Sequence, residues 1–208
     1  MKISYAIPVC NELVEITNLL NFLEDKIDRE DEVIVLFDTN NGSKVVEEYL
    51  RAKSVNPTFF TWHPYNFDGH FANMKNHLKS LCNGDWVFQI DADELPHESL
   101  ITNLKELLKL NPTTELLLVP RVNTVDGITQ EHINKWGWNL NEKGWVNWPD
   151  YQTRIIQNFP KIKWVSKVHE TITGFSTKAL LPREEEWCLY HPKDIKRQES
   201  QNNFYNTL

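Results

Sequence analysis

Residues 83–94 read Asn-Gly-Asp-Trp-Val-Phe-Gln-Ile-Asp-Ala-Asp-Glu, a short apolar run that leads directly into acidic residues. The apolar run has the length of a buried strand, and the Asn-Gly pair before it is typical of a turn that closes a helix. The sequence therefore predicts a strand over 85–90, with Asp91 and Asp93 just past its carboxyl end.

The segments around this strand alternate between strand and helix patterns. Further apolar runs predict strands at 3–9, 32–37, 58–62 and 115–119. Apolar residues at helical spacing predict helices at 13–27, 43–52, 67–81 and 96–108, the last opening at Pro96. Unbroken apolar runs suit parallel strands that are covered on both faces. The order predicts a three-layer α/β/α fold with a mainly parallel central sheet.

The pattern changes after residue 120. Gly, Asn and Trp become frequent, and the remaining strands are predicted to be short, near 151–156 and 162–168. Four of the eight tryptophans fall within residues 136–148, together with two glycines, which favours a structured loop over a core element. This region is predicted to extend the same sheet.

Bulk properties limit the class of protein. The chain has 208 residues, enough for one domain with a sizeable core, and its three scattered cysteines favour a reducing compartment. No apolar run approaches the ~20 residues of a membrane span, and residues 3–9 are too few for a signal peptide. We expect a cytoplasmic protein, with peripheral association at a membrane as an alternative.

Charge argues against a nucleic-acid-binding protein. The formal net charge is −7, which disfavours broad electrostatic contact with DNA or RNA. Basic residues near the C-terminus (Lys193, Lys196 and Arg197) are expected to lie on a solvated surface.

Polar residues follow three of the predicted strands: Asn11-Glu12, Asp38, and Asp91-Ala92-Asp93. Because ligands of parallel α/β sheets bind at the carboxyl ends of the strands, these segments predict one nucleotide-sized crevice.

Asp91 and Asp93 are two residues apart, so an extended chain would point both carboxylates to one side. Such a pair repels itself unless a divalent cation lies between, and oxygen ligands suit Mg²⁺ or Mn²⁺. The alternative is that these acids merely begin the next helix, where they offset its dipole. The spacing alone leaves both possibilities open.

A family resemblance bears on this choice. Residues 3–12, Ile-Ser-Tyr-Ala-Ile-Pro-Val-Cys-Asn-Glu, resemble the opening of family 2 glycosyltransferases, which have the A-type nucleotide-sugar fold. Residues 83–94 are similar to that family's Gly-Asp-strand-Asp-X-Asp segment, spacing included. Residues 149–156 and the later Val168-His-Glu170 resemble the branch that includes lipopolysaccharide-core glucosyltransferases. The resemblance implies a single domain over 1–208, with a nucleotide-sugar-binding half (1–120) and an acceptor-side half with a C-terminal tail (121–208).

The resemblance implies donor-binding roles for matching residues. Pro8, Glu12 and Asp38 would line the base and ribose pocket, and Lys75 would lie near the donor. Asp91 would approach the ribose and the metal. The turn after Asp38 has fewer acids than the family's usual turn, so uridine is only the default base.

The resemblance also implies metal and catalytic roles. Asp93, with Asp91 and His169, would hold Mn²⁺ or Mg²⁺. The family's short Glu-Asp motif is absent, which leaves Asp150 as the leading candidate for the general base and Glu170 as the second. A packed histidine at 169 and a turn cap at Asp150 are the alternatives.

The resemblance implies a metal-dependent, inverting glycosyltransferase that uses a nucleoside-diphosphate sugar. The acceptor would be a glycan, a lipid-linked sugar or a modified nucleobase, and Trp145 and Trp148 are candidates for its platform. Two rivals are a non-catalytic nucleotide- or sugar-binding module and an Asp-X-Asp phosphohydrolase. The second normally has its acids after the first strand, whereas here they follow the fourth.

Overall fold

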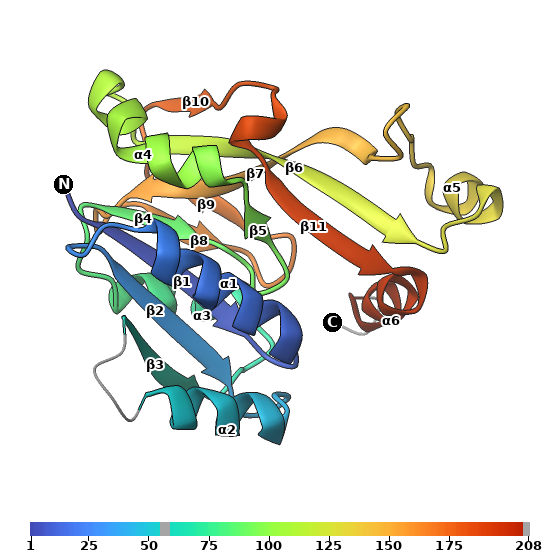
Figure 1. The fold of residues 1–208 in the computed structure, drawn as a ribbon, viewed down its shortest axis with the longest axis horizontal. Helices are drawn as coiled ribbons and strands as arrows, with labels where there is room; N and C mark the ends of the chain where they lie inside the picture. Colours follow the sequence, from blue (N-terminus) through green and yellow to red (C-terminus); the bar gives the residue numbers. More distant parts are fainter. Residues whose placement is uncertain (55–58, 206–208) are drawn as a thin grey trace.

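The computed structural model describes residues 1–54 and 59–205, which form a curled mixed sheet between helices (Figure 1). Thr58, the predicted start of the third strand, lies outside the described residues. In chain order the elements are β1 (Ile3–Val9), α1 (Leu13–Lys26), β2 (Glu32–Asp38), α2 (Lys44–Lys53), β3 (Phe60–Tyr65), α3 (Phe71–Ser80), β4 (Trp86–Gln89), β5 (Leu95–Pro96), α4 (Glu98–Leu110), β6 (Leu116–Asp126), α5 (Gln130–Trp136), β7 (Val146–Gln157), β8 (Lys163–Val165), β9 (Thr171–Thr173), β10 (Lys178–Leu180), the 3-10 helix η1 (Glu185–Trp187), β11 (Leu189–Asp194) and α6 (Ile195–Tyr205).

The main sheet has the strand order β3-β2-β1-β4-β7-β6-β11-β5, and β10 pairs with β6. Strands β3, β2, β1 and β4 run parallel, and β7 reverses direction between β4 and β6. Five of the eight pairings in this sheet, as far as the chain is described, are parallel. The predicted mainly parallel sheet is therefore confirmed.

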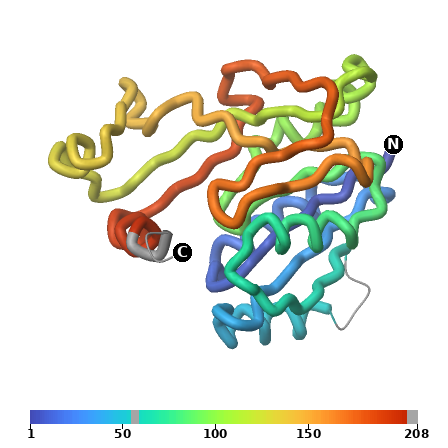
Figure 2. The backbone as a smooth tube through the Cα atoms, turned by 180° about the vertical axis from the view of Figure 1, so that it is seen from behind, coloured from blue at the N-terminus to red at the C-terminus, as the bar shows by residue number. Residues whose placement is uncertain are grey.

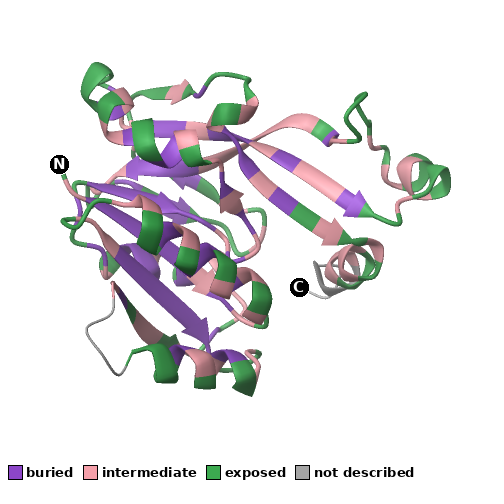
Figure 3. Ribbon diagram, in the orientation of Figure 1, coloured by how far each residue is buried: buried purple, intermediate pink, exposed green. Residues whose placement is uncertain are grey.

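Helices cover both faces of the sheet, as the three-layer prediction requires. Ile16, Val46 and Leu104, from α1, α2 and α4, are buried in one core cluster against the first face. Leu78 of α3 and Trp164 of β8 belong to a second cluster on the opposite face. Figure 2 shows α3 and the β8–β9 hairpin on that side, and Figure 3 shows the buried strands between the layers.

The helix predicted to open at Pro96 begins later. Leu95 and Pro96 instead form β5, which pairs antiparallel with Tyr190 and Leu189 of β11. The helix α4 starts at Glu98, after His97, whose Nδ1 accepts the backbone N–H of Ser99 at 3.1 Å. Pairing with a distant strand therefore overrides the helical signal of the proline.

Strands β6 and β7 are much longer than predicted. They pair from Leu116↔Ile156 to Asn123↔Val146. Only one end of each strand is apolar in sequence, and the polar residues of the rest hid its full length from the sequence pattern. The predicted division between residues 120 and 121 falls inside β6, so the two halves share this strand. Strand β8 is shorter than its predicted range of 162–168.

No helix within the two described ranges is long and apolar enough to cross a bilayer.

Candidate active site

A cavity of about 860 Å³ opens at the carboxyl ends of the parallel strands. One wall consists of the segments that follow β1, β2 and β4, and all three predicted polar segments line it: Asn11 and Glu12, Asp38, and Asp91 with Asp93. These segments meet because β1 runs parallel to both β2 and β4. The prediction of one shared crevice is confirmed.

The opposite wall is the face of the β7–β6–β11 part of the sheet. Alternate residues of these strands point into the cavity: Arg121 and Asn123 of β6, Asp150, Gln152 and Arg154 of β7, and His191 and Lys193 of β11. The spacing of two places them on one face. The cross-strand register sets Asp150 opposite Arg121, and His191 opposite Asn123. Only Asp150 of this wall was predicted as a site residue.

The carboxylate of Asp91 is held by a buried arginine. Nη2 of Arg154 donates to Asp91 Oδ2 at 2.5 Å and to Glu94 Oε1 at 2.6 Å. Burial disfavours the charged form of Asp91, but the charges of Arg154 and Lys75 outweigh it and lower its pKa. The Arg154 side chain is 3% exposed and that of Glu94 is fully buried. Asp91 therefore belongs to a buried ionic network as well as to the cavity wall.

Replacing Arg154 with methionine is expected to lower the free energy of unfolding by about 3 kcal/mol, because it removes the shared cation from the buried carboxylate of Glu94 and the partly exposed carboxylate of Asp91. Arg121, whose Nη1 lies 2.9 Å from Glu94, limits the loss. Lys161→Met is the matched control, since Lys161 pairs with Glu115 while half exposed, and a loss below about 1 kcal/mol is expected there. Urea unfolding measures both, and equal losses would contradict the prediction.

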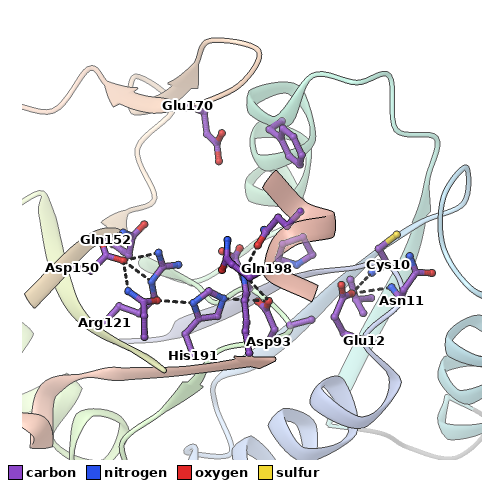
Figure 4. A pocket seen from close by; sticks show the side chains of 18 of the residues that line it. Cys10, Asn11, Glu12, Asp93, Arg121, Asp150, Gln152, Glu170, His191 and Gln198 are labelled. Carbon is purple, nitrogen blue, oxygen red and sulfur yellow. Dashed lines mark hydrogen bonds and ion pairs between the residues drawn. The ribbon is translucent and has the colours of Figure 1, made fainter. Parts of the chain in front are cut away.

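Asp93 and His191 face each other at the centre of the cavity (Figure 4). Nε2 of His191 lies 3.3 Å from Asp93 Oδ2, and its Nδ1 lies 2.7 Å from Asn123 Oδ1. The amide nitrogen of Asn123 donates to Asp150, which leaves its oxygen to accept from Nδ1–H. Neutral His191 then presents a lone pair at Nε2 toward a carboxylate oxygen. The two repel unless His191 is protonated or a cation binds both.

Two further cations approach Asp93 from the C-terminal segment. Nζ of Lys193 lies 3.9 Å from Asp93 Oδ2, and Nη2 of Arg197 lies 3.3 Å from it. Burial disfavours ionisation of Asp93, but the hydrogen bond and charge of His191, followed by the charges of Lys193 and Arg197, hold its pKa well below the usual range. The expectation that Lys193 and Arg197 lie on a solvated surface is wrong, because the side chain of Lys193 is buried in the cavity wall and the partly buried Arg197 pairs with Glu12, Glu15 and Asp93. Lys196 is exposed as expected.

His169, the predicted third metal ligand, lines the cavity from the loop between β8 and β9. Its backbone is left-handed, with a φ of 52°. In the part of the chain that the structure describes, no three His, Cys, Asp or Glu side chains are gathered as a preformed metal site. The set of Asp91, Asp93 and His169 is thus not assembled as one cluster, and its role in metal binding stays a prediction.

Asp150, the predicted general base, is held in a defined orientation. Its Oδ2 accepts from Nε and Nη2 of Arg121 at 2.9 and 2.6 Å and from Asn123 Nδ2 at 2.8 Å, and its Oδ1 accepts from Gln152 at 2.8 Å. Burial raises the pKa of Asp150, but Arg121 and the hydrogen bonds outweigh it, so the pKa is lowered. Asp150 is therefore ionised at neutral pH.

Glu170, the second candidate for the base, reaches into the cavity from the β8–β9 loop (Figure 4). Its Oε1 forms an ion pair with Lys75 of α3, and Nζ of Lys75 also lies 4.4 Å from the centre of the Trp164 ring. Lys75 is buried, so it is not a solvated residue of the helix surface.

The residues predicted to bind the base and ribose all line the cavity, and two of them also shape its backbone. Oε2 of Glu12 accepts the N–H groups of Cys10 and Asn11, both at 2.9 Å. Asp38 accepts the N–H of Asn40 at 2.9 Å, which fixes the turn after β2. Pro8 lies at the end of β1.

Residues 127–148 run from the end of β6 through α5 to the first residues of β7, and this segment, which extends away from the β1–β4 part of the sheet (Figure 1), contains four tryptophans; we call it the tryptophan arm. None of the four belongs to either core cluster of the described residues. Trp136 and Trp138 have ring centres 4.7 Å apart, and those of Trp145 and Trp148 are 4.9 Å apart. Trp138 also lines the cavity, which connects the arm to the site.

Comparisons with known proteins agree with the fold. A family model described as glycosyl transferase family 2 matches residues 4–179. TarS 1-349 of S. aureus in complex with UDP-GlcNAc is similar to this chain with a TM-score of 0.64 and 16% identity over 93% of the chain. TarS 1-349 in complex with UDP has a TM-score of 0.62 and 17% identity over 92% of the chain. The chain spans 59% and 60% of these two structures. A search of curated proteins found no match.

Proposed function

Because the chain belongs to glycosyltransferase family 2, we propose that it transfers a sugar from a nucleoside-diphosphate sugar to an acceptor hydroxyl, with inversion at the anomeric carbon. The observation that carries this proposal is the continuous polar network inside one cavity. It runs from Asp93 through His191 and Asn123 to Asp150, so the candidate metal carboxylate and the candidate base are fixed relative to each other.

Asp93 and His191 would hold a divalent cation, Mn²⁺ or Mg²⁺. The donor atoms fit, since a carboxylate oxygen and an imidazole lone pair face each other and Asn123 fixes the tautomer from behind. Water and the donor phosphates commonly complete such a shell. When bound, the cation offsets the charge that develops on the leaving nucleoside diphosphate. His169 remains a candidate third ligand.

The donor would lie along the strand-end wall. Pro8, Glu12 and Asp38 would border the base and ribose. Asp91 would contact the ribose, and Lys75 would approach the donor from the side of α3. TarS, which has a similar fold, was solved with UDP-GlcNAc and with UDP, which supports uridine as the first base to test. The resemblance to the lipopolysaccharide-core branch suggests glucose as a donor sugar.

Asp150 would accept the proton of the attacking hydroxyl. Within the described residues, its Oδ1 receives one hydrogen bond, from Gln152, and so has capacity left for a substrate hydroxyl. Arg121 and Asn123 fix the other oxygen. Glu170 is the second candidate, although its pairing with Lys75 favours a positioning role.

The tryptophan arm would present the acceptor. Trp138 lines the cavity and Trp148 lies two residues before Asp150, so an acceptor stacked on the arm would lead its hydroxyl toward the base. Aromatic rings pack on the apolar faces of sugar rings. Aromatic rings stack on nucleobases too, but the net charge of −7 disfavours nucleic acid, so a carbohydrate acceptor, either free or lipid-linked, is proposed.

Incubation with UDP- and GDP-sugars, with Mn²⁺, Mg²⁺ or EDTA, tests the proposal. We expect slow, cation-dependent release of nucleoside diphosphate from one donor, and faster release when the matching oligosaccharide acceptor is added. Donor binding without any turnover would leave a binding module, and phosphate release from simple monoesters would indicate a phosphohydrolase. Either result would overturn the proposal.

A further inference from the structure

Two cations lie where β11 meets α6: Lys193 lines the cavity, and Arg197 contacts acids of its wall. Strand β11 ends at Asp194. Oδ1 of Asp194 accepts the backbone N–H of Arg197 at 2.9 Å, which fixes the first turn of α6. Gln198 and Gln201 of the same helix line the cavity (Figure 4 labels Gln198). The helix α6 is therefore part of the cavity wall.

Arg197 contacts three carboxylates: Glu15 of α1, and Glu12 and Asp93 of the cavity wall. Its Nη1 lies 2.5 Å from Glu15 of α1, whereas its Nη2 lies 3.4 Å from Glu12 and 3.3 Å from Asp93. Strong charge-assisted hydrogen bonds are about 2.7–2.9 Å long. Glu15 thus anchors one end of the guanidinium, and the other end is shared by two carboxylates at longer distances.

Lys193 adds a second cation beside the first. Its side chain is 5% exposed, its Nζ lies 3.9 Å from Asp93, and it donates to the side-chain oxygen of Gln201. A buried ammonium is costly unless an anion is close. Within the described residues, Asp93 is the one acid paired with Lys193, and Lys193 shares it with Arg197, which also contacts Glu12 and Glu15.

We propose that Lys193 and Arg197 form the binding site for the diphosphate of the donor, with Glu15 as the residue that positions the arginine. This inference rests on the proposed function and adds to it the residues that recognise the diphosphate. A planar guanidinium binds phosphate oxygens with two N–H groups, and the loosely held Nη2 would exchange its long contacts for shorter ones to phosphate. The lysine acts as a point charge at the same group.

Calorimetric titration with matched ligands separates the diphosphate from the rest of the donor. UDP is compared with uridine, and GDP with guanosine, in the presence of Mn²⁺. For Arg197→Met we expect the affinity for the nucleoside diphosphate to fall about 10- to 100-fold, the range typical of a hydrogen bond to a charged group, while nucleoside affinity is unchanged. In Arg197→Lys, which keeps the charge, the affinity for the nucleoside diphosphate should fall less than in Arg197→Met.

Lys196→Met is the matched control, because Lys196 is exposed on the same helix and the substitution removes the same charge. We expect its affinities to stay within about twofold of the unchanged protein, since exposed charges are screened. Equal UDP affinity in Arg197→Met and the unchanged protein would overturn the inference and leave the proposed function intact. So would an equal loss in Lys196→Met, or a parallel loss of nucleoside affinity in Arg197→Met. Failure of the unchanged protein to bind UDP or GDP would instead overturn the proposed function.

Discussion

Replacing Asp93 with alanine is expected to lower the rate of sugar transfer by about 10³-fold and to remove its dependence on Mn²⁺. Asp93 is the carboxylate that His191 faces at 3.3 Å, and among the described residues it is the acid that pairs with both Lys193 and Arg197. Without it, His191 would be the one remaining ligand of the proposed pair. Transfer assays and Mn²⁺ titration by electron paramagnetic resonance measure the two effects. Full activity in this variant would remove the metal hypothesis.

Two comparisons separate the metal role of Asp93 from a structural one. Asp93→Asn keeps the shape of the side chain, so a loss of Mn²⁺ affinity with an unchanged melting temperature would indicate lost ligation. His191→Ala and His169→Ala then identify the histidine ligand. We expect the first to weaken Mn²⁺ binding more, because Asn123 fixes the tautomer that ligation requires. The opposite order would restore His169 to the role that the sequence predicted.

The strand-end wall of the site could be predicted from the sequence, and the reason is topological. Apolar runs mark β1, β2 and β4, and parallel strands bring their carboxyl ends together whatever the loops do. Glu12, Asp38, Asp91 and Asp93 therefore met in one cavity as predicted.

The second wall could not be predicted in the same way, because it depends on which strands become neighbours. Asn123 lies beside His191 only because β11 pairs with β6, although the two residues are 68 positions apart in the sequence. A partial signal was present: Asp150, Gln152 and Arg154 alternate with other residues, as strand residues that share one polar face do. That alternation indicates a strand that begins before residue 151 and carries Arg154 on the same polar face as Asp150. The sequence also contains a weak signal for the start of α5, because Thr129 and His132 have the spacing of a helix-capping pair.

Replacing Asp150 with asparagine is expected to lower the transfer rate by about 10²–10⁴-fold, the range associated with a general base, while donor binding is unchanged. Arg121 and Asn123 can still donate to the amide oxygen, and Glu94 still pairs with Arg121, so no buried charge is left alone. We therefore expect the melting temperature to change little. Single-turnover kinetics with saturating donor measure the chemical step directly.

Glu170→Gln is the matched control for Asp150→Asn, since it makes the same chemical change in the other candidate. Oε1 of Glu170 already forms an ion pair with Lys75, which favours a positioning role, so we expect a loss of less than about tenfold. If Glu170→Gln abolished transfer and Asp150→Asn did not, the base would lie on the β8–β9 loop. Attack would then come from the side of α3, and the acceptor could not approach along the tryptophan arm. The pair of variants thus decides the direction of acceptor entry as well as the identity of the base.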